Sequence, residues 1–428
     1  MKVGMISLGC DKNRVDSERM LFLLRSAGFV LTDDPSEAEA IIVNTCAFIE
    51  SAKKETIDVV LDTARLKTEG KLKKLIVTGC FAQRYPEVDF PEVDRFVSIA
   101  DEEKIASIVA EECGADYLPC AGQGRILTTP AYYAYLKIAD GCDNRCSYCA
   151  IPAIRGRYRS YPTEDLVREA TTLREEGVQE LILVAQDVTS YGKDLYGRPT
   201  ICELIKKLIG IGFWKIRLLY AYPERITDEL IELMASEPSV AKYIDMPLQH
   251  VDDGILRKMR RPTTGEKIRA RITELRKRVP DIAIRSTFIV GFPTETDEQY
   301  IKLESFVAEG ALDYAGFFVY SPEEGTDAYE MKPRIGKGVA RKRLLACERA
   351  QSAATVAAQK KYVGRTLDVL YEGIDFDKQL FYGRSEYNAP DVDTKVFFTG
   401  KFTPEPGKIY KVKIISSDFH LYGEAEDV

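Results

Sequence analysis

The chain has 428 residues and a net charge of −7, with 45% hydrophobic and 30% charged residues. This length allows two or three domains, and the acidic balance argues against a nucleic-acid-binding surface spread over the whole protein. No stretch approaches the roughly 20 apolar residues of a membrane span, and the N-terminus lacks a secretory signal. We therefore expect a cytoplasmic protein without a membrane partner, in which clustered cysteines bind metal and do not form disulfides.

Residues 1–120 alternate short apolar runs with amphipathic stretches, a pattern typical of a parallel α/β sheet. The expected strands lie at 2–8, 40–44, 75–78 and 95–99, and the expected helices at 15–27, 50–66 and 102–113. A glycine-rich, irregular segment follows, and we expect it to provide a linker at 121–130.

Three cysteines of this region, Cys10, Cys46 and Cys80, each stand just past the carboxyl end of an expected strand. The carboxyl ends of parallel strands share one edge of the sheet, where ligands bind. A lone cysteine is usually a small buried hydrophobic residue, but three at equivalent positions predict a metal site. The remaining cysteines show no such placement and are expected to be structural: Cys113, Cys120, Cys202 and Cys347.

A loop with the spacing C-x3-C-x2-C carries Cys142, Cys146 and Cys149 after an apolar run. Three thiolates on one loop can hold three irons of a cubane cluster and leave the fourth iron open to a small molecule. Structural zinc normally needs four Cys or His ligands, and the two histidines of the chain, His250 and His420, lie far from the loop in sequence. A disulfide cannot use three thiols evenly, and an electron-transfer protein would need clusters with four protein ligands each. Cys10, Cys46 and Cys80 are also three in number, so they predict a second cluster in which one iron has no protein ligand.

Residues 131–362 repeat the β–α alternation in longer units, with expected strands at 135–139, 181–185, 215–220, 243–246, 283–290 and 315–320. Six such units after a cluster loop predict a partial TIM-like barrel, with its chemistry at the carboxyl ends of the strands. Gln186 and Gly291 stand at two of these ends, where ordinary loop or capping chemistry is the alternative interpretation. His250 stands at a third end and is interpreted as a solvent-facing loop residue, not as a ligand.

A helix expected at 339–362 leads to five short strands, at 366–371, 380–385, 394–398, 409–415 and 419–424. Strands of this length, separated by turn residues, predict a small antiparallel barrel over residues 363–428. We therefore expect two α/β regions, at 1–120 and 131–362, followed by a small all-β domain at 363–428.

The cysteine loop, with Tyr148 before its last cysteine, resembles the radical S-adenosylmethionine (SAM) superfamily. The chain as a whole resembles the methylthiotransferases, radical SAM enzymes that replace a C–H bond with C–S–CH3. This resemblance implies an N-terminal cluster domain at 1–120, a radical SAM domain at 131–362 and a TRAM barrel at 363–428. It implies that the loop cysteines hold a 4Fe-4S cluster that cleaves SAM, and that the other three motif cysteines, Cys10, Cys46 and Cys80, hold an auxiliary 4Fe-4S cluster. It also implies SAM as methyl donor, and Tyr148, Gln186 and Gly291 as candidate SAM contacts.

Family members modify either the 2-position of a tRNA adenosine or the β-carbon of an aspartate in small-subunit ribosomal protein twelve. Segments 7–17, 44–53, 248–250 and 383–391 resemble the type that acts on the ribosomal protein, for which a one-electron reductant and a sulfur donor are implied partners. Residues 361–428 carry nine Lys or Arg and twelve Asp or Glu, a net charge of −3. An acidic module suits a basic ribosomal protein better than tRNA phosphates, although surface charge can also serve solubility alone. The expected substrate is the ribosomal protein or ribosome, and tRNA is the alternative.

Overall fold

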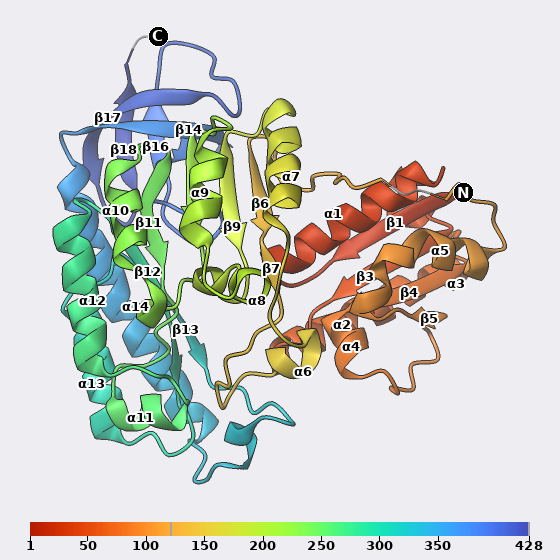
Figure 1. Ribbon diagram of the computed structural model, residues 1–428, viewed down its shortest axis with the longest axis horizontal. Helices are drawn as coiled ribbons and strands as arrows, with labels where there is room; N and C mark the ends of the chain where they lie inside the picture. The colour runs from red at the N-terminus through yellow and green to blue at the C-terminus, as the bar shows by residue number, and fades with distance from the viewer. Residues whose placement is uncertain (120–121, 427–428) are drawn as a thin grey trace. The chain divides into compact units, whose positions relative to one another are not determined.

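The structure, a computed structural model, describes residues 1–119 and 122–426 (Figure 1). Cys120 and Ala121, the first residue of the expected linker, lie outside the described residues. The chain divides into two compact units. The first unit comprises Met1–Pro130, Tyr135–Arg159 and Ser321–Tyr329, and the second comprises Ala131–Ala134, Ser160–Tyr320 and Glu330–Val428. The cysteine loop at 142–149 therefore belongs to the same unit as the three earlier motif cysteines.

A parallel sheet with the strand order β2-β1-β3-β4-β5 forms the centre of the first unit. Its strands are β1 (Lys2–Ser7), β2 (Val30–Thr32), β3 (Ala40–Thr45), β4 (Lys74–Gly79) and β5 (Arg95–Phe96). The parallel α/β class expected for this region is confirmed. The sequence pattern does not reveal β2, because three residues are too few to show a strand period.

Helices cover both faces of this sheet. On one face Met20 and Leu24 pack with Val109, and on the other face Val60 packs with Val77. The covering helices bury all six residues of β3, which leaves the carboxyl edge of the sheet as the place where ligands bind in this architecture. The helices of this unit are α1 (Asp11–Ser26), η1 (Pro35–Glu37), α2 (Glu50–Ala64), α3 (Leu66–Glu69), α4 (Cys80–Arg84), η2 (Ile99–Lys104), α5 (Ile105–Cys113) and α6 (Ile151–Arg155).

A six-stranded sheet with the order β13-β12-β11-β10-β9-β6 follows the chain order from strand to strand, and the neighbours from β9 to β13 are parallel. The sequential order of parallel strands confirms the expected partial TIM-like barrel. Its strands are β6 (Tyr133–Lys137), β9 (Glu180–Val184), β10 (Lys215–Leu218), β11 (Val240–Asp245), β12 (Ala283–Val290) and β13 (Tyr314–Val319), and the short strands β7 (Ala139–Asp140) and β8 (Arg159–Ser160) pair with each other.

Helices connect these strands and pack on the outer side of the sheet (Figure 1). Within residues 1–119 and 122–426, none of the helices combines the length and the apolar character that a membrane crossing requires. The connecting helices are α7 (Thr163–Glu175), η3 (Val188–Ser190), α8 (Lys193–Tyr196), α9 (Ile201–Ile209), η4 (Pro223–Arg225), α10 (Asp228–Ser236), α11 (Asp253–Lys258), α12 (Gly265–Arg278) and α13 (Asp297–Ala308). Three further helices follow β13: η5 (Asp327–Glu330), which begins in the first unit, α14 (Lys337–Gln359) and η6 (Lys360–Tyr362).

The C-terminal strands close into a five-stranded barrel in the order β14-β15-β16-β18-β17. The expected barrel is confirmed, but the expectation that it is antiparallel throughout is wrong for one pair, because β16 and β18 are parallel. Strand direction cannot alternate around a closed ring with an odd number of strands, so at least one pair must be parallel. The strands are β14 (Thr366–Asp375), β15 (Leu380–Arg384), β16 (Val396–Thr399), β17 (Ile409–Ser417) and β18 (Leu421–Ala425).

A buried ionic network fixes this small barrel to the sheet of the second unit. Glu180 accepts a hydrogen bond from Arg217 at 2.7 Å and pairs with Arg384 of the small barrel at 2.7 Å. The side chains of Arg217 and Glu180 have no exposed surface. Tyr243 and Val369 join the same apolar cluster across this interface. The small barrel and the sheet of the second unit therefore belong to one compact body.

Candidate functional site

The structure places Cys10, Cys46 and Cys80 at the carboxyl ends of three strands of the first unit. Cys10 lies between β1 and α1, Cys46 directly follows β3, and Cys80 begins α4 directly after β4. Because β1, β3 and β4 are neighbours in a parallel sheet, the three turns lie along one edge. The cysteines share the edge at which ligands bind in this fold class, and metal binding by them stays a prediction.

One buried side chain, that of Asn13, contacts all three turns. Its Nδ2 donates hydrogen bonds to the carbonyl oxygens of Leu8 (3.1 Å) and Thr45 (2.8 Å). The Sγ of Cys80 lies 3.8 Å from its Oδ1. Asn13 therefore fixes the positions of the three cysteine turns relative to one another. Sequence reasoning missed this role, because the contacts join residues up to 67 positions apart.

Two glycines allow the turns to approach closely. A Cβ placed on Gly9 would lie 3.1 Å from Sγ of Cys46. Gly79, directly before Cys80, has a φ of 86°, and a Cβ placed there would lie 2.2 Å from Oδ1 of Asn44. A side chain at Gly79 would therefore clash and would also strain the backbone. Both turns depend on glycine to bring the cysteines together.

The candidate ligands at this edge are thiols. Burial raises the pKa of Cys46, and it raises the pKa of Cys80 to about 12, so these thiols stay protonated near neutral pH until a metal displaces the protons. Within the described residues, no three Cys, His, Asp or Glu side chains converge as ligands of a single ion. A cubane cluster binds each thiolate through a different iron, so its ligands stand farther apart than those of one zinc ion. The chemistry of the donors fits an iron–sulfur cluster.

The loop at 141–149 is held by backbone hydrogen bonds. The N–H of Cys142 donates to the carbonyl oxygen of Gly156 (3.1 Å), and the N–H of Cys149 donates to that of Cys146 (3.1 Å). Cys142 is buried, whereas Cys146 and Cys149 are partly exposed. Three thiols thus lie on one short, ordered loop, as a cluster with one open iron requires.

Gly141 permits the close packing at the start of this loop. Its φ is 74°, and a Cβ placed there would lie 2.1 Å from the carbonyl oxygen of Arg157. Any other residue would have to displace backbone atoms of the segment after α6. The first cysteine of the loop is therefore positioned by the contact between Gly141 and that segment.

A buried ion network links α1 to the segments on either side of the cysteine loop. Nη1 of Arg155 lies 3.0 Å from Asp16 Oδ2 and 2.8 Å from Asp140 Oδ2. Lys137 pairs with Asp140 at 3.1 Å and also with Asp16. Burial alone would raise the pKa of Asp140, but Lys137 and Arg155 hold it below its usual value. Arg155 also donates to Oδ1 of Asn13, so one guanidinium connects the loop segment with the side chain that fixes the cysteine edge.

Glu102 lies buried beside this network. Its Oε1 accepts a hydrogen bond from Thr78 Oγ1 at 3.1 Å. Burial and the nearby charge of Asp16 raise the pKa of Glu102 to about 8. The carboxyl group is therefore protonated at neutral pH in the folded chain.

We expect the variant Glu102→Gln to remove a pH dependence of stability. The pKa of Glu102 is about 8 in the folded chain, against a reference value of 4.5. The protonated carboxyl therefore contributes its full share to the stability of the wild type below pH 4.5, and this share is lost as the pH rises towards 8. Relative to the wild type, the free energy of unfolding of the variant should rise by about 1.4 kcal/mol per pH unit across that range. Thermal unfolding at pH 5.5 and 8.0 measures this change, with Glu103→Gln, at an exposed neighbour, as the matched control. Equal differences from the wild type at both pH values would contradict the expectation.

Two of the candidate SAM contacts lie at the carboxyl edge of the second-unit sheet. Gln186 follows β9 and Gly291 follows β12, whereas Tyr148 lies on the cysteine loop in the first unit. The N–H of Gly291 donates to Glu295 Oε2 at 2.8 Å, and a Cβ placed on Gly291 would lie 2.6 Å from Cβ of Ala340. Packing against α14 therefore already requires glycine at this position. Contacts of the three candidates with SAM stay predictions.

His250 is fully buried, so the interpretation of it as a solvent-facing residue is wrong. Its Nδ1 accepts a hydrogen bond from the N–H of Asp252 at 3.0 Å, which places the ring proton on Nε2. Nε2 lies 3.2 Å from Oε1 of Glu295, which also pairs with Arg343. The backbone of Asp252 and the carboxylate of Glu295 satisfy the imidazole, and sequence alone does not reveal the second partner because it lies 45 positions along the chain.

The other described cysteines show properties of structural residues. Burial raises the pKa of Cys202 to about 11 and that of Cys347 to about 12, and it also raises the pKa of Cys113. All three lie within helices, Cys113 in α5, Cys202 in α9 and Cys347 in α14, and not at the carboxyl end of a strand.

Comparison with known proteins covers the chain almost from end to end. Residues 2–98 match the Uncharacterized protein family UPF0004, residues 136–307 the Radical SAM superfamily and residues 363–425 the TRAM domain. The chain is 44% identical to the ribosomal protein uS12 methylthiotransferase RimO of Lachnoclostridium phytofermentans, over all of both chains. The chain belongs to the RimO family of radical SAM methylthiotransferases. The RimO of Geobacter sulfurreducens is 44% identical over 99% of this chain and 98% of its own, and that of Pelobacter propionicus is 43% identical over 100% and 98%.

Solved structures with a similar fold include two radical SAM enzymes. The radical SAM methyltransferase TsrM from Kitasatospora setae has a TM-score of 0.54 and 14% identity, covering 76% of each chain. The cobalamin-dependent radical SAM enzyme OxsB has a TM-score of 0.52 and 12% identity, covering 81% of this chain and 56% of its own. At such low identity this similarity shows the fold alone, and it agrees with the RimO family architecture. As a member of that family the chain is a transferase.

Proposed function

We propose that the chain transfers a methylthio group to the β-carbon of an aspartate in ribosomal protein uS12. Relatives that match it over essentially the full length carry the name of that activity. The structural observation that supports the proposal is that Cys10, Cys46 and Cys80 lie along one sheet edge, and that Asn13 contacts the three turns that carry them. This edge belongs to the same compact unit as the loop at 142–149, as an enzyme with two clusters requires.

Each set of three cysteines would hold one 4Fe-4S cluster with an open iron. When bound, the cluster on the loop at 142–149 supplies, with SAM, the radical chemistry needed to break an unactivated C–H bond, and the cluster on Cys10, Cys46 and Cys80 supplies sulfur. A second SAM is the methyl donor, and a one-electron reductant and a sulfur donor complete the set of partners. Tyr148, Gln186 and Gly291 are the proposed SAM contacts.

The chain's own residues would hold both sites and keep water from them. Asn13 fixes the turns of one cysteine set, and Arg155 joins Asn13 to the segment after the loop. Cys80 and Cys142 are buried, whereas Cys10 is exposed and Cys46, Cys146 and Cys149 are partly exposed, so each site is shielded on the side of its buried cysteine. A dry and rigid site protects reactive species from side reactions.

The charge of the small barrel supports a protein substrate over the alternative, a tRNA adenosine. Residues 361–428 carry a net charge of −3. Two of the lysines pair with carboxylates of the same barrel, Lys408 with Glu405 at 2.6 Å and Lys411 with Asp368 at 3.1 Å. A tRNA-binding module would offer free cations to phosphates, whereas an acidic surface complements a basic ribosomal protein. A ribosomal substrate would place the enzyme in the cytoplasm.

Mass spectrometry of the products tests the substrate. Anaerobically reconstituted enzyme is incubated with a strong reductant and SAM, separately with uS12 and with unmodified tRNA. We expect one methylthio group in place of one hydrogen on an aspartate of uS12 and no change in tRNA. Modification of tRNA alone would overturn the assignment.

A further inference from the structure

The exposed side of α14 and the turn before it carry a dense positive charge. Residues 332–349 contain seven Lys or Arg and one Glu, a net charge of +6, in a chain whose net charge is −7. Six of these cations are exposed, and we call five of them the basic stripe: Lys332, Lys337, Arg341, Lys342 and Arg349. Positions 337, 341 and 349 span about 18 Å along the helix and about 120° of its circumference.

The cations of the basic stripe have no acidic partner, whereas some other exposed cations of the second unit are paired. Lys206 pairs with Glu229 at 2.7 Å, and Arg198 pairs with Glu203. Among the described residues, none of the five stripe cations lies within ion-pair distance of a carboxylate. The nearby Arg343 points inward and pairs with Asp297 at 2.6 Å. The positive charge of the stripe is therefore left for anions outside the chain.

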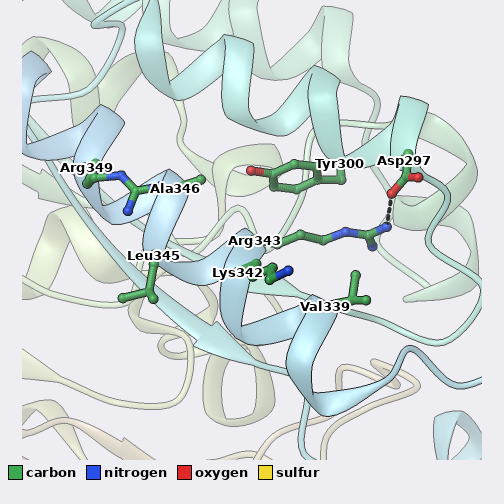
Figure 2. Close-up of a pocket in the computed structure, with 8 residues that line it drawn as sticks. All are labelled: Asp297, Tyr300, Val339, Lys342, Arg343, Leu345, Ala346 and Arg349. Carbon is green, nitrogen blue, oxygen red and sulfur yellow. Dashed lines mark hydrogen bonds and ion pairs between the residues drawn. The ribbon is translucent and has the colours of Figure 1, made fainter.

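A groove lies beside the stripe (Figure 2). Its volume is about 410 Å³, and it is lined by Asp297 and Tyr300 of α13 and by six residues of α14 that include Lys342 and Arg349. Val339 and Leu345, two apolar lining residues, are 47% and 37% exposed. An apolar recess flanked by cations suits a sugar or base attached to bound phosphates.

We propose that the basic stripe binds the phosphate backbone of ribosomal RNA, so that the enzyme acts on uS12 within an RNA–protein assembly. This inference rests on the proposed function, because RNA phosphate is the anion that surrounds a ribosomal protein. The second unit carries two segments of opposite charge, residues 361–428 with −3 and residues 332–349 with +6. A ribosomal subunit offers a matching pair, a basic protein and RNA phosphates. A group of unpaired cations along one helix can contact several phosphates, and its binding would release counterions.

The test compares a stripe variant with a charge-matched control. The stripe variant is Lys337→Glu/Arg341→Glu/Lys342→Glu. The control variant, Arg198→Glu/Lys206→Glu/Lys207→Glu, makes the same change in charge at cations that are paired with carboxylates. Binding of each to naked small-subunit ribosomal RNA and to intact small subunits is measured by fluorescence anisotropy over a range of salt concentrations.

For the stripe variant we expect at least a tenfold loss of affinity for both RNA and subunits at 0.1 M salt. The slope of log K against log salt should fall in magnitude by about 2 to 3, since each lost phosphate contact removes about 0.7 to 0.9. The control should bind like the wild type. Equal binding of naked RNA by the stripe variant and the control would overturn the proposal. A loss confined to intact subunits would overturn it as well and would indicate an acidic protein as the partner.

Turnover separates this inference from the proposed function. The stripe variant should modify free uS12 at the wild-type rate but lose most of its activity on uS12 within small subunits. If no form of uS12 is modified while RNA binding depends on the stripe, the proposed function fails and the RNA surface stands. If uS12 in subunits is modified equally by both variants, the RNA surface fails and the proposed function stands.

Discussion

Replacing Cys10, Cys46 and Cys80 with alanine should lower the iron content of the anaerobically reconstituted chain from about eight to about four atoms. The three thiols lie at one sheet edge, and the cysteine loop at 142–149 keeps its own ligands in this variant. We therefore expect the variant to cleave SAM when reduced but to lose transfer of the methylthio group completely. Iron and sulfide analysis, with electron paramagnetic resonance of the reduced protein, measures the first effect, and product analysis measures the second.

The matched control for this variant is Cys113→Ala, in the same unit. Burial raises the pKa of Cys113, and the residue lies at the end of α5 and not at a strand end. It should retain about eight irons and full activity. Retention of about eight irons by the triple variant would show that these cysteines hold no cluster, and the sulfur-transfer proposal would fail with it.

Replacing Arg155 with methionine should destabilise the first unit by about 3 to 5 kcal/mol, the usual cost of removing one partner from a buried ion pair. The variant leaves Asp16 and Asp140 with Lys137 as the remaining cation of the network. It also removes the hydrogen bond to Asn13 Oδ1. For a unit of this size the expected fall in melting temperature is on the order of 10 °C. Thermal unfolding followed by circular dichroism measures it.

The same variant should loosen the cysteine edge, because Asn13 loses the donor that orients it. We expect a shifted or broadened paramagnetic signal from the cluster on that edge. Arg198→Met is the matched control, since Arg198 pairs with Glu203 at the surface, where removing a partner costs less than about 1 kcal/mol. The double variant Arg155→Met/Asp16→Asn should recover part of the stability, because it removes one uncompensated charge. Equal melting temperatures of the Arg155 and Arg198 variants would show that the network does not stabilise the unit.

Much of the fold was predictable because its signals are local. Apolar runs of strand length, separated by amphipathic stretches, indicate the strands of both parallel sheets, and β3 is buried at all six positions. The strand ends at Cys10, Cys46 and Cys80 could be predicted for the same reason. The parallel pairing of β16 with β18 could not, since it follows from closing five strands into a ring.

The sequence by itself determined which residues can be cluster ligands, because the spacing of the loop cysteines and their positions after strands are features of nearby residues. The tertiary structure alone decided how those residues are held. Asp16 and Arg155 are 139 positions apart in the sequence. Asn13 contacts a turn that lies 32 positions away, and the local sequence does not predict that contact either. Hydrogen bonds and ion pairs act over a few ångströms in space, and nothing in the local pattern of a chain records which distant polar groups folding will bring within that range.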